Sequence, residues 1–453
     1  ALVAVVIVGL LLVTSDVLSS DINQFPESWN LHLRQQIDAF QDWVIGNRAT
    51  HPVFTYFFEP ISDAIDWGIR RLEAFLLMIP WPILIVATAL LGYRAGGLPI
   101  SLLAVAGLMF MGLVGLWEES MQTLALMGVS VLIALLIGIP LGILAGRFDR
   151  VEAILRPLLD GMQTMPAFVY LIPVLLFFGI ARVPSVVATV IYALPPAIRL
   201  TSLGIRRVSP AAVEAARSFG STSRQTLFKV QLPLALPTIM TGVNQTIMMA
   251  LGIVVIAALI GAGGLGREVL ISLQRLRVGE GLMAGLAIVF MAVILDRIGQ
   301  GFSQQDASHS AKMARGFVLL PNSWHRFAPA RWIERGLQAL IHGAYQLSVL
   351  IADSLASLVG AALRLFKLED TAVTVASLFR RHTFLVGSLF LLIVLAVLNM
   401  AAPASTFPGG LYVDLTAPVD NSVDWMRDNL YQIGNLPLGT GPFSDFLVIY
   451  ALN

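Results

Sequence analysis

Three glycines, Gly261, Gly263 and Gly266, have the GxGxxG spacing that binds the phosphates of a dinucleotide when it joins a strand to a helix. That chemistry also needs an acidic residue about 20 positions further on, inside a βαβ unit. Here an apolar run at 234–260 precedes the glycines, and another run begins at 281. We therefore expect a glycine-packed turn at the end of a membrane span, and no nucleotide site.

Other patterns that carry chemistry are missing from the sequence. The three lysines, Lys229, Lys312 and Lys367, follow no GxxxxGK[ST] loop, so the chain is not a P-loop ATPase. The six histidines are scattered and show no HExxH or similar metal spacing. Cysteine is absent, which excludes disulfides and thiolate metal sites. We expect no enzyme activity and no cofactor in this chain, so any ATP and Mg²⁺ must be bound by a partner.

The composition is that of an integral membrane protein. Of 453 residues, 57% are hydrophobic and 13% are charged, and the mean hydropathy is +0.80. Soluble domains carry about 25% charged residues. The net charge of +1 gives no reason to expect a nucleic-acid partner. Apolar runs that can cross about 30 Å of hydrocarbon lie at 1–14, 75–93, 98–117, 123–146, 165–181, 184–204, 234–260, 281–299 and 384–402, and a last begins near 443.

A polar segment interrupts these runs between 205 and 233, and we refer to it as the 205–233 loop. Ser209-Pro210 is typical of a helix start, and Gly220 suits a left-handed helix end. Thr222 and Gln225 have the spacing of a capping box that opens a second helix. Leu232-Pro233 is expected to end that helix. The loop is thus predicted to be two short helices joined at a glycine corner.

The distribution of charge predicts the orientation. Segment 15–74 has nine acidic residues against four arginines, whereas Arg94, Arg147 and the 205–233 loop fall on the opposite side if spans alternate. By the positive-inside rule, the loop is cytosolic and segment 15–74 is an external acidic tail. Residues 301–383 are basic at both ends, and we expect them to form a cytosolic linker. Within that linker, 332–366 is expected to be an amphipathic helix in the membrane interface, and the alternative is a further membrane span.

The start of the chain repeats near its end at an offset of 382 residues. Asp42-Trp43 falls on Asp424-Trp425, Ser62-Asp63 falls on Ser444-Asp445, and the apolar run 1–13 falls on 383–395. These matches predict a tandem duplication. Residues 384–453 would then begin a second copy of the chain's membrane-spanning unit, and we expect the natural chain to continue beyond Asn453 through further spans and a second loop.

The 205–233 loop resembles the EAA loop of ATP-binding-cassette importer permeases. The pattern is Glu-Ala-Ala, a glycine four residues on, and then Val-x-Leu-Pro, with Val230 where the family usually has Ile. The resemblance implies that this loop docks into a groove on a separate ATPase subunit. The residues it assigns to coupling are Glu214, Ala215, Ala216, Gly220, Leu232 and Pro233.

Residues 60–300 closely resemble the permeases of quaternary-amine importers of the glycine betaine type, with relatives for choline, carnitine or trimethylamine oxide. The stretches LLDGMQTMPAFVYLIP, VNQTIMMAL, IGAGGLG and ISLQRLRVGEG carry this resemblance. It implies an all-α polytopic fold with a type I, methionine-importer-like permease core at 75–300 and amphipathic helices outside the membrane. Candidate residues for the substrate path, for which helix packing is the alternative role, are Gln163, Thr164, Phe168, Tyr170, Asn244 and Gln245.

These expectations describe a permease subunit in the bacterial inner membrane. Its expected partners are a cytosolic ATPase dimer, a periplasmic or lipid-anchored substrate-binding protein, membrane lipid and a second permease copy. The expected substrates are betaine-like methylamines, which cannot cross hydrocarbon unaided. The alternatives are an importer for another small polar solute, an ATPase-independent secondary transporter or channel, and a non-transporting osmosensing scaffold.

Overall fold

The computed structural model describes residues 33–179, 181–303 and 407–433, with a few isolated positions between 346 and 394. The described residues are helical and contain no strand, which confirms the all-α class. The chain divides into two units, Ala1–Pro60 and Ile61–Asn453. The expected span 1–14, the 332–366 helix, the span 384–402 and the run from 443 lie outside the described residues.

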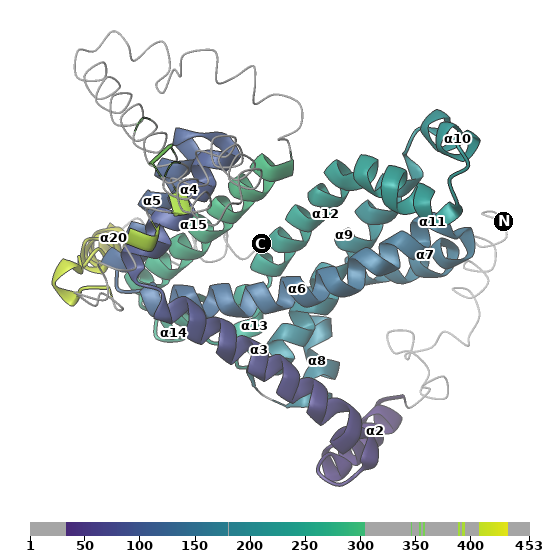
Figure 1. The fold of residues 1–453 in the computed structure, drawn as a ribbon. Helices are drawn as coiled ribbons and strands as arrows, with labels where there is room; N and C mark the ends of the chain where they lie inside the picture. Colours follow the sequence, from purple (N-terminus) through teal and green to yellow (C-terminus); the bar gives the residue numbers. More distant parts are fainter. Residues whose placement is uncertain are drawn as a thin grey trace, which may run out of the picture. The chain divides into compact units, whose positions relative to one another are not determined.

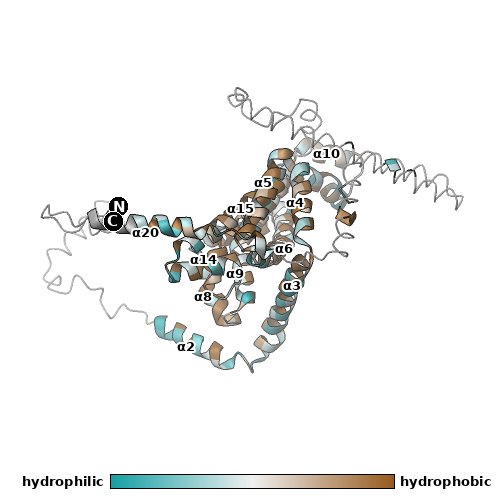
Figure 2. Cartoon of the chain, turned by 90° about the vertical axis from the view of Figure 1, so that its left-hand side faces the viewer, coloured by the Kyte–Doolittle hydropathy of each residue, from teal (hydrophilic) through white to brown (hydrophobic). Residues whose placement is uncertain are grey.

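The first unit contains α2 (Leu33–Asn47) and a π-helical turn, η3 (Phe54–Phe58). Aromatic rings hold the corner between them: Trp43 lies 5.3 Å from His51 and 6.3 Å from Phe54, measured between ring centroids. Such ring pairs stabilise a short segment that has little other core. Figure 2 shows α2 as mainly hydrophilic, which agrees with a helix outside the membrane.

The centre of the second unit is the pair α6 (Trp117–Arg147) and α9 (Arg182–Arg206). Three glycines on α6, spaced four residues apart, let the helix backbones approach closely, because a Cβ at Gly138 or Gly142 would lie within 2.7 Å of α9 atoms. Small residues serve this purpose where helices pack in a membrane. On its other side α9 packs against α12 (Leu232–Gly252), as Figure 1 shows.

A second group of helices consists of α4 (Trp81–Gly96), α5 (Leu98–Leu113) and α15 (Val278–Ser303). It joins the centre through the contact of α15 with α12. Figure 2 shows α5 and α15 as hydrophobic over most of their length. Among the described residues four helices are long and apolar enough to span a membrane, or up to six if each of two bent helix pairs is one span.

The two bent pairs correct the span expected at 75–93 and refine the one at 165–181. Helix α3 (Glu59–Met78) ends just before Pro80, and α4 leaves it at 99°. Helix α7 (Asp149–Thr164) is followed by α8 (Ala167–Phe178) at 103°, across Pro166. The residue before a proline is disfavoured in helical conformation, so each bend lies where the sequence forces a break. The run expected at 234–260 is likewise divided, into α12 and α13 (Val254–Ala258).

The remaining described helices are short or lie at the ends of the long ones. They are α10 (Pro210–Ser218), α11 (Ser223–Thr226), the π-helical turn η4 (Leu227–Gln231), α14 (Leu265–Gln274), the 3-10 turn η6 (Gly409–Leu411) and α20 (Thr416–Ile433). Figure 1 places α10 and α11 together beyond the ends of α9 and α12.

Candidate coupling and path sites

The 205–233 loop folds as two short helices around Gly220. Ser209 precedes α10 with an extended backbone, but its side chain makes no capping bond, so that part of the expectation was wrong. Gly220 has a φ of +78° and a Cβ there would meet nothing within 4 Å. The amide of Ser221 donates to the carbonyl of Ala216, and that of Gly220 donates to Arg217. These two bonds form the glycine-dependent end of a helix known as the Schellman motif.

The second half of the loop opens with the expected capping box. Gln225 donates its backbone amide to the Thr222 hydroxyl at 3.3 Å, and Thr222 donates its own amide to the Gln225 side chain at 2.9 Å. Both bonds satisfy amides that a helix start leaves unpaired. This part of the loop was predicted correctly from its spacing.

The expected helix end at Leu232-Pro233 is wrong. The chain remains helical from Ser223 to Gly252, because the turn at Leu227–Gln231 widens to the π form. There the amide of Leu232 donates to the carbonyl of Leu227, five residues back. Proline has no amide to donate, and the wide turn removes the need for one at Pro233. The loop therefore continues directly into α12.

Exposure separates the base of the loop from its tip. Leu227 is buried with Ile205 and Ala235, so the base packs on the ends of α9 and α12. At the tip, Glu214 and Ala215 are exposed and Ala216 is half-buried. At the base, where α12 begins, Leu232 is half-buried and Pro233 is exposed. Phe219, beside the glycine corner, is 91% exposed. An apolar ring so open to water favours a partner surface.

Phe219 was not among the residues expected from the sequence to contact an ATPase subunit. The signal was present, since a phenylalanine immediately before a glycine helix end stands out in an otherwise polar segment. Its exposure, however, depends on how α10 lies on the core, which residue spacing alone does not give.

Arg206 fixes the end of α9 beside the loop. Its guanidinium pairs with Asp149 at 2.7 Å and with Glu152 at 2.5 Å, both in the first turn of α7, and donates to the carbonyl of Ala145 at 2.6 Å. Arginine suits this role because its planar group donates several bonds in fixed directions. The start of α7, the end of α6 and the end of α9 are thereby tied together.

The candidate path residues of the α7–α8 bend do not all point the same way. Gln163 and Thr164 end α7 and are exposed, and Phe168 on α8 is also exposed. Tyr170 is buried, and its hydroxyl donates to the carbonyl of Met162 across the bend. Tyr170 therefore stabilises the bend, while the other three present polar and aromatic groups at the surface of this chain.

The other two candidates lie on α12 and face different directions. Asn244 is 8% exposed and lies against Gly299 of α15, where a Cβ would meet its amide oxygen at 2.0 Å. Gln245 is exposed on the next position of the helix. Since α9 lies between α8 and α12, the structure does not bring the six candidates together within this chain.

The glycines of the GxGxxG pattern form a packed turn, as expected. Gly264 has a φ of +76° and caps α14, and its amide donates to Gln122 at 3.2 Å. The next amide, that of Leu265, donates to the Thr123 hydroxyl at 2.8 Å. Side chains of α6 thus satisfy the two amides that a phosphate would need at this helix start.

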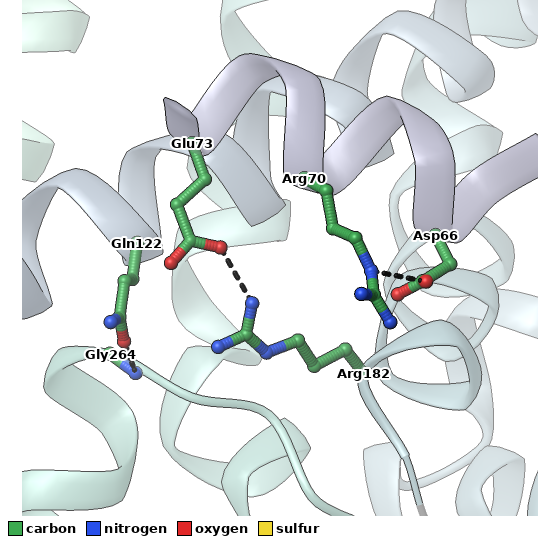
Figure 3. Close-up of polar contacts among 6 residues, drawn as sticks. All are labelled: Asp66, Arg70, Glu73, Gln122, Arg182 and Gly264. Carbon is green, nitrogen blue, oxygen red and sulfur yellow. Dashed lines mark hydrogen bonds and ion pairs between the residues drawn. The ribbon is translucent and has the colours of Figure 1, made fainter. Parts of the chain in front are cut away.

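Next to this turn, charged residues line a cleft of about 490 Å³ at the start of α9. Arg182 pairs with Glu73 of α3 at 2.6 Å, and Arg70 pairs with Asp66 at 2.6 Å (Figure 3). Helix α3 is thereby attached to α9 by an ion pair that joins residues 109 positions apart. Within the described part of the chain, no group of three or more potential ligands could hold a metal ion.

Comparison with known proteins supplies the family. Residues 138–304 match the family model described as "Binding-protein-dependent transport system inner membrane component". The chain is 46% identical over 267 residues to the glycine betaine/proline betaine transport system permease protein ProW of Escherichia coli (strain K12), covering 59% of this chain and 74% of that one. It is 44% identical to the glycine betaine transport system permease protein OpuAB of Bacillus subtilis (strain 168), over 60% of this chain and 94% of that one.

Two further similarities concern more distant proteins. The trimethylamine N-oxide transport system permease protein TmoV of Ruegeria pomeroyi is 33% identical, over 78% of this chain and 52% of that one. Among solved structures, the MetNI methionine ABC transporter in an inward-facing conformation aligns with a TM-score of 0.35 and 25% identity, over 42% of this chain and 92% of that one.

Proposed function

This chain belongs to the family of binding-protein-dependent transport system inner membrane components, the permease subunits of ATP-binding-cassette importers, and we propose that it imports betaine-like methylamines or related compatible solutes. The proposal rests on relatives of 44% and 46% identity whose names specify glycine betaine or proline betaine. Such substrates carry a permanent charge on a methylated nitrogen, which binds favourably to the faces of aromatic rings.

The energy for transport comes from a separate ATPase subunit. In this proposal the exposed tip of the 205–233 loop, with Glu214, Ala215 and Phe219, binds a groove on that subunit. Gly220 shapes the corner of the loop, and Leu232 and Pro233 at its base join it to α12. When ATP closes the ATPase dimer, the loop moves and the permease opens to the other side, as alternating access requires.

The proposed orientation follows from charge. The 205–233 loop lies in the cytosol with the ATPase, and the acidic tail 15–74 lies outside, where a substrate-binding protein delivers the solute. The permease core is residues 75–300, and 301–383 is the cytosolic linker to a second copy that begins at 384.

The substrate path forms where two permease copies meet. Gln163, Thr164 and Phe168 are exposed on one copy, and we assign them to the wall that faces the second copy. Gln245 joins this wall, whereas Asn244 and Tyr170 act by packing. A neutral polar wall with an aromatic ring suits a methylated cation, because it offers attraction without trapping the charge.

The test is uptake into proteoliposomes that contain this chain with its ATPase and substrate-binding protein. We expect ATP-dependent accumulation of radiolabelled glycine betaine, with unlabelled choline or trimethylamine N-oxide added separately as competitors. If none of the three compounds accumulates or competes, the substrate class is wrong. Accumulation without the ATPase would instead favour a secondary transporter or channel, and absence of flux for any solute would favour a scaffold.

A further inference from the structure

A segment near the end of the described chain is anchored in the core of the permease. Phe407 is 4% exposed, and its ring centroid lies 4.9 Å from that of Trp81 and 5.9 Å from that of Trp117. The amide of Val413 donates to the carbonyl of Leu113, the last residue of α5, at 2.8 Å. Burial of this phenylalanine removes its apolar surface from water and so stabilises the docked segment.

A second anchor lies on α15. The carboxylate of Asp420, in the first part of α20, accepts the amide of Gly279 at 2.8 Å. Gly279 is in the first turn of α15, where amides have no partner within the helix and the helix dipole attracts negative charge. Asp420 therefore acts as a cap supplied from 141 residues away.

Two glycines of the core make room for this segment. A Cβ on Gly112 would lie 2.2 Å from the ring of Phe407, and a Cβ on Gly279 would lie 2.7 Å from the carbonyl of Thr416. We call the surface formed by Trp81, Gly112, Leu113, Trp117 and Gly279 the tail groove. One end of the groove is apolar and binds a phenylalanine, and the other end is polar and binds a carboxylate. These two residues, Phe407 and Asp420, are 13 positions apart in the bound segment.

The first tail has the same two anchors at the same spacing. Phe407-Pro408 lies 382 residues after Phe25-Pro26, and Asp420 lies 382 residues after Asp38. The corresponding residues of both segments are helical where they are described, in α2 (Leu33–Asn47) and in α20 (Thr416–Ile433). The chain therefore carries two tails with matching anchors.

We propose that residues 25–47 bind the tail groove of a second copy of the permease core, so that two copies exchange their tails. Within its own unit, Ile37 and Phe40 are exposed on α2, and the Asp38 carboxylate makes only a solvent-exposed pair with Arg34 at 3.7 Å, which docking would replace at little cost. The described core instead holds the tail of the second copy. This inference depends on the repeat and on the groove, and not on which solute is transported.

The test uses competition for the groove in the full chain, which has no cysteine of its own. The variant Leu113→Cys/Val413→Cys is oxidised in lipid nanodiscs, and the rate of disulfide formation reports the docked segment 407–420 without altering Gly112 or Gly279. A synthetic peptide of residues 24–47 is then added. We expect an excess of the peptide to slow the cross-link at least tenfold, because it carries both anchors and competes for the same groove.

Controls make the result specific. The same peptide with Phe25→Ala and Asp38→Ala is expected to leave the rate unchanged. Failure of the pair to cross-link, no protection by the native peptide, or equal protection by the substituted peptide would each overturn tail exchange. None of these results depends on transport, so the proposed function is tested separately.

Discussion

The backbone amide of Ser221 donates to the carbonyl oxygen of Ala216 at 3.1 Å, and this bond closes the glycine corner of the 205–233 loop. The angle between α10 and the following helix α11 is therefore fixed by this backbone bond and by the positive φ of Gly220. The exposed face of α10 is presented by a rigid corner, and changes at this corner are expected to affect coupling more than folding.

Replacing Gly220 tests the corner directly. Gly220→Ala introduces no clash but forces a side chain into the left-handed region, which costs about 1 kcal/mol. We expect ATP-driven uptake to fall severalfold while the melting temperature in detergent changes by only a few degrees. Gly220→Asn is the matched control, since asparagine tolerates this conformation, and it should retain more uptake than the alanine variant. Equal loss in both variants would contradict a conformational role.

Phe219 is expected to bind the ATPase. Phe219→Ala removes a ring that is 91% exposed, so stability should change by less than about 0.5 kcal/mol. If the ring fills a pocket on the partner, affinity for the ATPase should fall about tenfold or more, as measured by co-purification or by ATPase stimulation. Tyr56→Ala, at a ring 80% exposed in the first unit, is the control and should have no effect. Unchanged affinity for Phe219→Ala would remove it from the interface.

Glu214 adds a negative charge to the exposed surface of α10. Because it is exposed, Glu214→Lys should leave the fold intact and abolish ATP-stimulated uptake through repulsion at the docking groove. Glu214→Gln keeps the shape and should lose less. Capture of substrate by the binding protein is the control and should be the same in all variants. Full uptake in the lysine variant would argue against docking through this residue.

Gly264 is expected to be critical for stability because of space as well as conformation. A Cβ there would lie 2.3 Å from the Thr123 hydroxyl and 2.8 Å from the carbonyl of Glu119, at a φ of +76°. Gly264→Ala should therefore cost about 3 kcal/mol or more, since overpacking and backbone strain add. Gly285→Ala, on α15 with nothing within 4 Å, should be neutral or stabilising by up to about 1 kcal/mol. Thermal unfolding in detergent measures both.

The Glu73–Arg182 pair is expected to contribute modestly to stability. Glu73 is 15% exposed and Arg182 is 38% exposed, so solvent screens part of the attraction. A double-mutant cycle with Glu73→Gln and Arg182→Gln should give a coupling of about 1 kcal/mol, near the upper end for accessible pairs. The exposed Arg277–Glu280 pair, at 2.9 Å, is the control and should give about 0.3 kcal/mol. A zero value for the Glu73–Arg182 pair would mean that this ion pair does not help to hold α3 on α9.

The stability of the segment 407–433 is expected to depend on pH through Asp414. Hydrogen bonds from the Thr416 hydroxyl and from the amides of Ala417 and Thr416 lower the pKa of this carboxyl below its usual 3.8. Since the folded pKa is the lower one, the stabilisation is present above pH 3.8 and is lost as pH falls through the folded pKa. Hydrogen exchange should show α20 less protected in Asp414→Ala than in the native chain at pH 7. That difference should shrink as the pH falls through the lowered pKa and the carboxyl is protonated, and a difference that persisted after protonation would exclude the carboxylate as its cause.

Local spacing predicted the features that depend on a few neighbouring residues. The Thr222–Gln225 capping box, the left-handed Gly220 and the packed turn at Gly264 all formed as expected, because each depends on backbone geometry within one turn. The helical class followed from hydropathy, since a chain in lipid must satisfy its backbone bonds internally.

Expectations that depended on distant partners were less accurate. The helix end at Leu232-Pro233 was wrong because a π turn, supported by burial of Leu227 among Ile205 and Ala235, carries the helix past the proline. Side-chain direction at Asn244 and Gln245 also depends on which neighbour each meets. The capping of α15 by Asp420 joins residues 141 positions apart, and no local pattern in the sequence indicates it.

The unbroken helix from Ser223 to Gly252 has a mechanical consequence. Its 30 residues span about 45 Å, so it behaves as a stiff lever with one end in the 205–233 loop and the other beside α13. A tilt of about 10° imposed at the loop would displace the far end by about 8 Å, from the same length. A break at Pro233 would absorb that motion in a hinge, whereas the continuous helix would carry the proposed movement of the 205–233 loop to its other end.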